Sequence, residues 1–62
     1  MCELKVFVLK GEMREKVMDG VVRITVQDGS VLLAGIFGES MKVEGRLTKV
    51  DIMAQTADVT AN

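Results

Sequence analysis

The segment that decides the fold class is residues 22–37, which read VRITVQDGSVLLAGIF. In its first part, apolar residues at the even positions 22–26 alternate with polar ones, as on a strand with one buried face. The Asp28-Gly29-Ser30 turn that follows is a hairpin signal, because glycine accepts the positive φ of a tight turn. Residues 31–37 are apolar on both faces, which predicts a strand covered by the core on one side and by a partner on the other. The segment therefore predicts a β-hairpin.

The same signals recur along the whole chain. Further apolar segments lie between four turn signals, spaced about nine residues apart: Lys10-Gly11, Asp19-Gly20, Asp28-Gly29-Ser30 and Gly38-Glu39-Ser40. This spacing predicts hairpins near each of these glycines and a small sandwich or barrel. Residues 41–47 and 50–54 alternate as two further strands, and Ala57-Asp58 is expected to turn the chain into a short last strand. Residues 12–18 suit a strand or a short turn equally well.

Chain length and cysteine content point to a homodimer. A domain of 62 residues buries a smaller fraction of its surface on folding than a larger domain does, so its stability usually depends on a disulfide, a metal or a partner subunit. One cysteine cannot form a disulfide within the chain, and the absence of histidine removes an obvious zinc cage. The hydrophobic content of 48% leaves enough apolar surface for a second copy of the chain.

Charge and hydropathy argue against several classes of partner. Eight basic and nine acidic residues are spread along the chain, whereas nucleic-acid binders usually carry a basic excess, so a nucleic-acid partner is not expected. No run of 18 apolar residues predicts a membrane helix, and the first residues do not resemble a signal peptide. A single free thiol then predicts a cytoplasmic protein.

The sequence does not predict an enzyme. It has no histidine to activate Cys2 or a serine, and no phosphate-binding loop. Carboxylates that could form an acid–base pair are not brought together by any spacing: Glu39, Glu44, Asp51 and Asp58. The scattered methionines are interpreted as core or interface residues, and the two phenylalanines, Phe7 and Phe37, as core residues.

Cys2 is the candidate metal ligand. In the first expected strand it shares a face with Leu4, Val6 and Val8, so it can be read as a small buried hydrophobe. Its position also allows a second interpretation. If Met1 is removed, the Cys2 thiolate and α-amine can chelate a metal, and if Met1 stays, the thiolate and the amide nitrogen are available. Two such pairs from a two-fold dimer give a planar four-donor site, which is typical of Ni(II) or Cu(II).

The sequence resembles the CooT family, accessory proteins in the maturation of carbon monoxide dehydrogenase. The most specific matches are Cys2, the Ile36-Phe37-Gly38-Glu39 run, and the pattern Val43-x-Gly45-x-Leu47-x-x-Val50-Asp51. Hydrogenase-maturation chaperones of the HypC type also begin Met-Cys, but they usually contain proline, which this chain lacks.

The resemblance implies a fold, an assembly and a cargo. We expect residues 1–62 to form one all-β domain, a small SH3-like or Sm-like barrel of five to seven short antiparallel strands. The resemblance also implies a homodimer that binds one Ni(II) through Cys2 of both chains, with carbon monoxide dehydrogenase or another nickel enzyme as client. Two alternatives stay open at this point: an RNA-binding Sm-like module, suggested by fold analogy, and a dimeric interaction module without metal.

Overall fold

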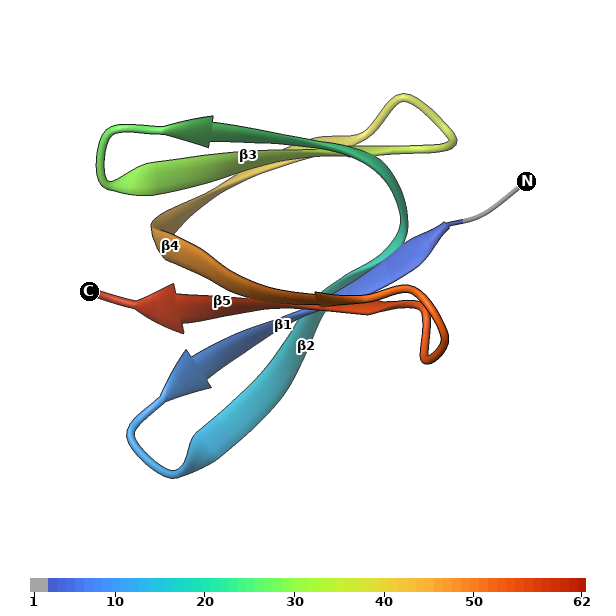
Figure 1. Cartoon of the computed structure of the whole chain (residues 1–62). Coiled ribbons are helices and arrows are strands. Elements are labelled where there is room, and N and C mark those ends of the chain that lie inside the picture. Colours follow the sequence, from blue (N-terminus) through green and yellow to red (C-terminus); the bar gives the residue numbers. More distant parts are fainter. Residues whose placement is uncertain (1–2) are drawn as a thin grey trace.

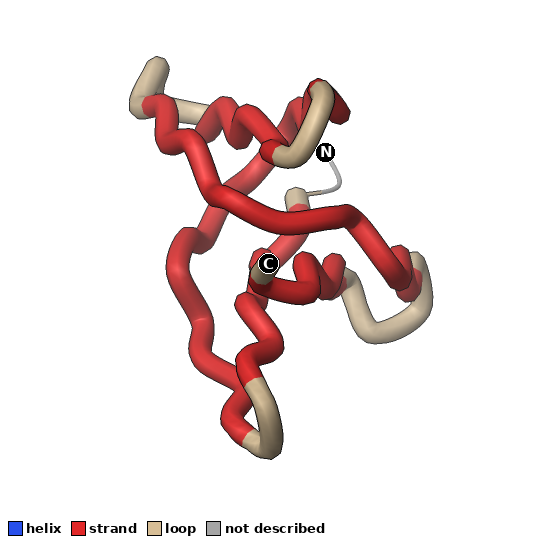
Figure 2. The backbone as a smooth tube through the Cα atoms, turned by 90° about the vertical axis from the view of Figure 1, so that its left-hand side faces the viewer, coloured by secondary structure: helices blue, strands red, loops and turns tan. Residues whose placement is uncertain are grey.

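In the computed structural model, which describes residues 3–62, the chain forms a closed five-stranded β-barrel (Figure 1). The strands are β1 (Leu4–Lys10), β2 (Met13–Gln27), β3 (Ser30–Gly35), β4 (Ser40–Asp51) and β5 (Thr56–Ala61). Consecutive strands pair antiparallel, and β5 closes the barrel by pairing parallel with β1. The all-β barrel prediction is confirmed, with one parallel pair at the closure. Figure 2 shows that the loops are short compared with the strands.

The chain reverses at three of the four predicted hairpins and bends at the fourth. Turns occur at Gly11, Gly29 and Gly38, as expected. At Gly20 the prediction of a hairpin is wrong, because β2 continues through this residue for a total of 15 residues. Gly20 has a φ of 61°, and the pairing of β2 with both of its neighbours shifts register close to it. An irregularity of this kind bends a strand without ending it.

A second long strand replaces two predicted ones near the C-terminus. The segment expected at 41–47 lies within β4, which runs through Gly45 to Asp51. Of the segment expected at 50–54, only residues 50 and 51 belong to β4, and residues 52–55 form the turn. The turn predicted at Ala57-Asp58 is therefore wrong, since both residues lie within β5. The short last strand itself is confirmed. Residues 12–18, left open by the sequence, belong mainly to β2.

The bends and turns gather at two opposite ends of the barrel (Figure 1). We call one the N-terminal end: it holds the start of β1, the bend at Gly20, the loop 36–39 and the turn 52–55. The opposite end holds the turns at Gly11 and Gly29, the bend of β4 and the C-terminus. Backbone hydrogen bonds tie each end together. Ile36 N donates to Gly20 O at 2.9 Å, and Gly45 N donates to Gly29 O at 3.0 Å.

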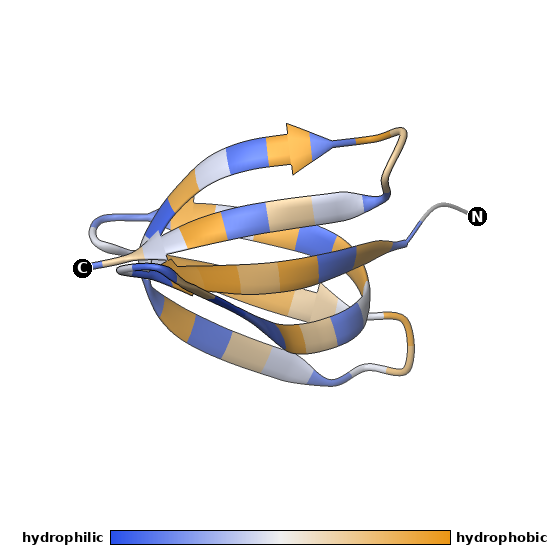
Figure 3. Ribbon diagram, turned by 90° about the horizontal axis from the view of Figure 1, so that it is seen from below, coloured by the Kyte–Doolittle hydropathy of each residue, from blue (hydrophilic) through white to orange (hydrophobic). Residues whose placement is uncertain are grey.

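The core lies inside the barrel and contains Val6, Val21, Val31, Leu33, Val43, Ala57 and Val59. Along most strands the hydropathy alternates as predicted (Figure 3). In β2 it does not: Val21 is fully buried, whereas Val22, expected inside, is 44% exposed. The register shift between Val21 and Arg23 explains this difference, because an extra residue in a strand changes which side chains face inward.

No helix formed by residues 3–62 is long and apolar enough to cross a membrane.

Candidate functional site

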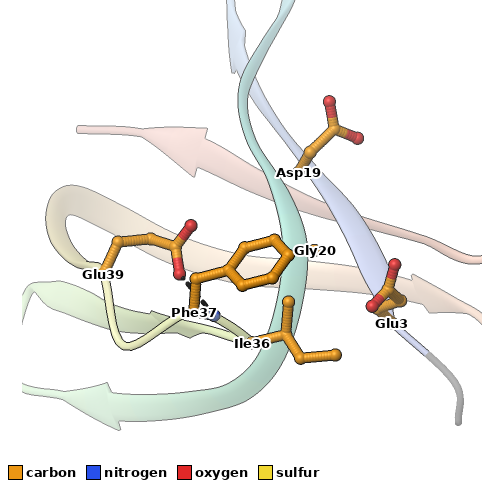
Figure 4. Close-up of a pocket in the computed structure, with 6 residues that line it drawn as sticks. All are labelled: Glu3, Asp19, Gly20, Ile36, Phe37 and Glu39. Atoms are coloured by element: carbon orange, nitrogen blue, oxygen red, sulfur yellow. Dashed lines mark hydrogen bonds between the residues drawn. The ribbon is translucent and has the colours of Figure 1, made fainter.

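A pocket of about 310 Å³ opens at the N-terminal end of the barrel (Figure 4). It is lined by Glu3, Asp19, Gly20, Ile36, Phe37 and Glu39. These residues come from the residue preceding β1, the bend of β2 and the loop between β3 and β4. The pocket thus depends on the bend of β2, which brings Gly20 against the loop.

The loop 36–39 is held by hydrogen bonds within itself. Gly35 N donates to Glu39 O at 2.8 Å, and Gly38 N donates to Gly35 O at 3.1 Å. The Glu39 carboxylate accepts from Phe37 N at 2.9 Å (Figure 4). The Glu39 side chain also lies where a Cβ on residue 35 would stand, so only glycine at that position allows this arrangement. The loop therefore has a defined shape before any partner binds.

Phe37 is a strongly exposed apolar residue of this loop. Its side chain is 89% exposed, so the interpretation of Phe37 as a core residue is wrong. In Figure 4 its ring lies beside Gly20 and Glu39 at the pocket. Ile36, the residue before it, is also exposed. Apolar side chains held out in water in this way are typical of contact sites.

Three carboxylates line the same pocket, from Glu3, Asp19 and Glu39. The carboxylate of Asp19 is 2.7 Å from the Lys16 ammonium. The hydrogen bond from Lys16 holds the pKa of Asp19 below its ordinary value. Desolvation raises this pKa in part, and the positive charges of Lys16 and Lys5 lower it. Among residues 3–62, no three His, Cys, Asp or Glu side chains form a group that could hold a metal ion.

Glu3 and Asp19 were not predicted as pocket residues from the sequence. Nothing in their spacing predicts that the bend of β2 lies beside the start of β1. Glu39 was considered only as a possible acid–base partner. The other carboxylates considered for that role have partners elsewhere. Asp58 binds Arg14, Asp51 accepts from Ala54 N, and Glu44 lies 3.8 Å from the Lys42 ammonium.

Cys2, the predicted metal ligand, lies outside the described residues. It directly precedes Glu3 in the sequence, and Glu3 lines the pocket. The loop that faces Glu3 across the pocket contains the Ile36-Phe37-Gly38-Glu39 run.

Comparison with protein families gives a match over residues 1–59 to the family described as CO dehydrogenase accessory protein CooT. The chain belongs to the CooT family. The predicted resemblance is thereby confirmed over nearly the full length of the chain.

A solved structure supports the fold of this CooT chain. It is the crystal structure of a candidate CooT from Carboxydothermus hydrogenoformans, 18% identical, with a TM-score of 0.88 and 98% of each chain covered. At this identity the likeness shows a shared fold. A comparison with curated proteins found no match.

Proposed function

We propose that this CooT chain is a nickel-binding accessory protein that holds one Ni(II) between the two Cys2 residues of a homodimer. The observation that carries the proposal is the position of Glu3. This residue follows the predicted ligand directly and lines a pocket together with the loop 36–39 of the CooT resemblance.

The donor chemistry supports Cys2 as the ligand. The chain has one cysteine and no histidine, and residues 3–62 offer no group of three ligating side chains. Thiolate is the side chain of this sequence that suits a tightly bound transition metal best. We therefore assign the nickel ligand to Cys2. One thiolate with one neighbouring backbone nitrogen makes two donors, and a two-fold axis doubles them to four. Four donors of this kind suit the planar coordination of Ni(II) better than the tetrahedral coordination of zinc.

In this proposal nickel is cargo, and the client is carbon monoxide dehydrogenase. The family description names CO dehydrogenase as the enzyme that CooT proteins assist. A ligand set completed only when two chains meet gives such a protein a simple way to release its metal. Separation of the two chains leaves each thiolate with half of the donors, which weakens the site.

Anaerobic titration with Ni(II), followed by absorbance, tests the assignment of the ligand. We expect thiolate-to-nickel charge-transfer bands in the wild-type protein and their complete loss in Cys2→Ser. Met13→Ser is the matched control, because it removes another sulfur from an exposed position at the opposite end of the barrel and should leave the bands unchanged. Bands that persist in Cys2→Ser would overturn the proposal. Absence of bands in the wild type would overturn it too, and salt-sensitive RNA binding would then favour the RNA-binding alternative.

A further inference from the structure

Four strand segments form one sheet along the side of the barrel. β1 pairs with the first half of β2 and with β5, and β5 also pairs with the second half of β4 (Figure 1). Side chains alternate between the two faces of a strand, and residues paired across neighbouring strands share a face. Val6 and Val59 belong to the core, so their neighbours Phe7 and Asp58 point outwards. The Arg14 guanidinium, which contacts both Phe7 and Asp58, lies on this outer face too.

Most of the positive charge of the chain lies on this outer face. On one flank Lys16 is paired with Phe7, and on the other Lys49 is paired with Asp58. We call the cations of this surface the basic face, and they are Lys5, Arg14, Lys16, Arg46 and Lys49. They make up five of the eight basic residues of the chain, whereas seven of its nine acidic residues lie elsewhere. The face is therefore positive on a chain whose net charge is -1.

Three cations of the basic face keep an unbalanced charge. The other two are balanced within the chain by Asp58 and Asp19, whose carboxylates lie 3.0 and 2.7 Å from the basic groups. In the part of the chain that the structure describes, Lys5, Arg46 and Lys49 form no salt bridge, and all three residues are exposed. Grouped charges of one sign attract an oppositely charged partner and speed up its association.

Two features of the basic face favour an acidic protein surface over a nucleic acid as its partner. Phe7 is covered by the Arg14 guanidinium, 3.8 Å from the ring centre, so its ring is not free to stack on a base. The face is also short, since the seven residues of β1 extend about 23 Å. A nucleic acid that extended beyond it would meet the acidic remainder of the chain. A folded protein with a local group of carboxylates meets the cations alone.

The basic face begins beside the pocket at the N-terminal end of the barrel. Asp19 lines the pocket and also pairs with Lys16 of the face. Lys5 follows the pocket residue Glu3 by two positions, and its positive charge acts on Asp19. A protein bound along this face therefore lies next to the pocket.

We infer that the basic face is the surface by which this protein docks on its client enzyme, and that it binds an acidic patch of that enzyme. The inference rests on the proposed function for the identity of the client, carbon monoxide dehydrogenase. Charges arranged in this way set the orientation and the rate of encounter more than the affinity. A contact that forms quickly and stays weak suits an accessory protein that leaves after it delivers its cargo.

Biolayer interferometry of the full chain on purified, nickel-free carbon monoxide dehydrogenase, at several salt concentrations, tests the docking surface. We expect binding to weaken as salt rises, because salt screens exposed charges. Arg46→Glu and Lys49→Glu should each raise the dissociation constant about fivefold or more, since each replaces an attraction by a repulsion. Circular dichroism and thermal unfolding would show that each variant keeps the fold.

Arg23→Glu and Lys42→Glu are the matched controls. They make the same two changes at exposed residues of the strand segments that pair with β3, outside the basic face. The net charge of the chain changes equally in all four variants, so a general effect of charge would weaken all of them alike. We expect each control to change the dissociation constant less than about twofold.

The outcomes separate this inference from the proposed function. Arg46→Glu and Lys49→Glu that bind the enzyme as tightly as the wild type would overturn the inference, as would a wild-type chain that does not bind the enzyme. Binding of a mixed-sequence RNA oligonucleotide in place of the enzyme, lost in the same variants, would assign the face to nucleic acid instead.

Nickel is measured separately by titration of the same variants. Arg46→Glu and Lys49→Glu should keep the nickel bands, because neither residue is a proposed ligand, whereas Cys2→Ser should lose nickel and still bind the enzyme. Enzyme binding that depends on the basic face in a chain without nickel bands would support the inference and reject the nickel proposal. Nickel bands in a chain that does not bind the enzyme would reject the inference alone.

Discussion

Arg14 shows how one side chain can serve two neighbours on the outside of the barrel. Its guanidinium lies 3.0 Å from the Asp58 carboxylate and 3.8 Å from the centre of the Phe7 ring. Asp58 is buried although it is charged, because β5 lies between β1 and β4. The arginine balances this charge and covers the half-buried Phe7 by a cation–π contact. Phe7 is half-buried but lies outside the core, so the sequence interpretation of Phe7 as a core residue is wrong.

Replacement of Arg14 should destabilise the fold more than replacement of a comparable surface cation. We expect Arg14→Met to lower the free energy of unfolding by about 1–2 kcal/mol, because Asp58 is left buried without its partner. The expected loss is modest because the Arg14 side chain is 45% exposed, so that solvent screens its attraction to Asp58. Lys16→Met breaks the exposed pair with Asp19, which solvent screens, and should lower the free energy of unfolding much less than Arg14→Met does. Urea denaturation measures both, and equal effects would contradict this account.

The Lys16–Asp19 pair should also make the stability of the fold depend on pH. The hydrogen bond from Lys16 lowers the pKa of Asp19, so the pair adds stability above the ordinary pKa of 3.8 and loses it as the pH falls through the lowered value. In Lys16→Met the pKa of Asp19 should rise towards 3.8. Carboxyl-carbon NMR titration measures this shift, and an unchanged pKa would show that Lys16 is not its cause.

At the scale of the strands, the four glycine turn signals predict where the chain changes direction but not how, whereas the turn 52–55 was not predicted. The four turn signals, about nine residues apart, lie at three turns of the barrel and at the bend of β2. They could not distinguish a hairpin from a bend, because Asp-Gly suits both, and at Gly20 the pairing of β2 with two neighbours keeps the strand continuous. The same irregularity reversed the expected burial of Val22. Burial in β1 was predicted well, because the inward positions Leu4, Val6 and Val8 follow the strict alternation of a strand.

Replacement of Gly45 tests the bend of β4 most directly. A Cβ at this position would collide with the backbone carbonyl of Thr60 on β5, and its φ of 156° disfavours other residues. We expect Gly45→Ala to lower the free energy of unfolding by at least about 2 kcal/mol, since backbone cannot move aside cheaply. Gly11→Ala is the control. Its φ is also positive, but a Cβ there meets nothing within 4 Å, so only the conformational cost of about 1 kcal/mol remains. Thermal or urea unfolding that ranks the two variants equally would contradict the collision.

For the whole molecule, the candidate site was predicted in part. The loop 36–39 was singled out through the family resemblance, whereas its proximity to Glu3 depends on closure of the barrel, which no local pattern encodes. Phe37 was misassigned because hydropathy alone cannot tell a core residue from an exposed contact residue. The outer side chains of residues 31–37 include Leu32 and Phe37, which are exposed, and their contact with a partner stays a prediction.

Native mass spectrometry of the nickel-loaded protein tests the central claim most directly, because it reports the number of chains and metals together. We expect a species with two chains and one Ni(II), and no nickel on Cys2→Ser. Lower pH should weaken binding, because protons compete for the thiolates. One nickel on each single chain, or an undiminished load on Cys2→Ser, would contradict the shared site.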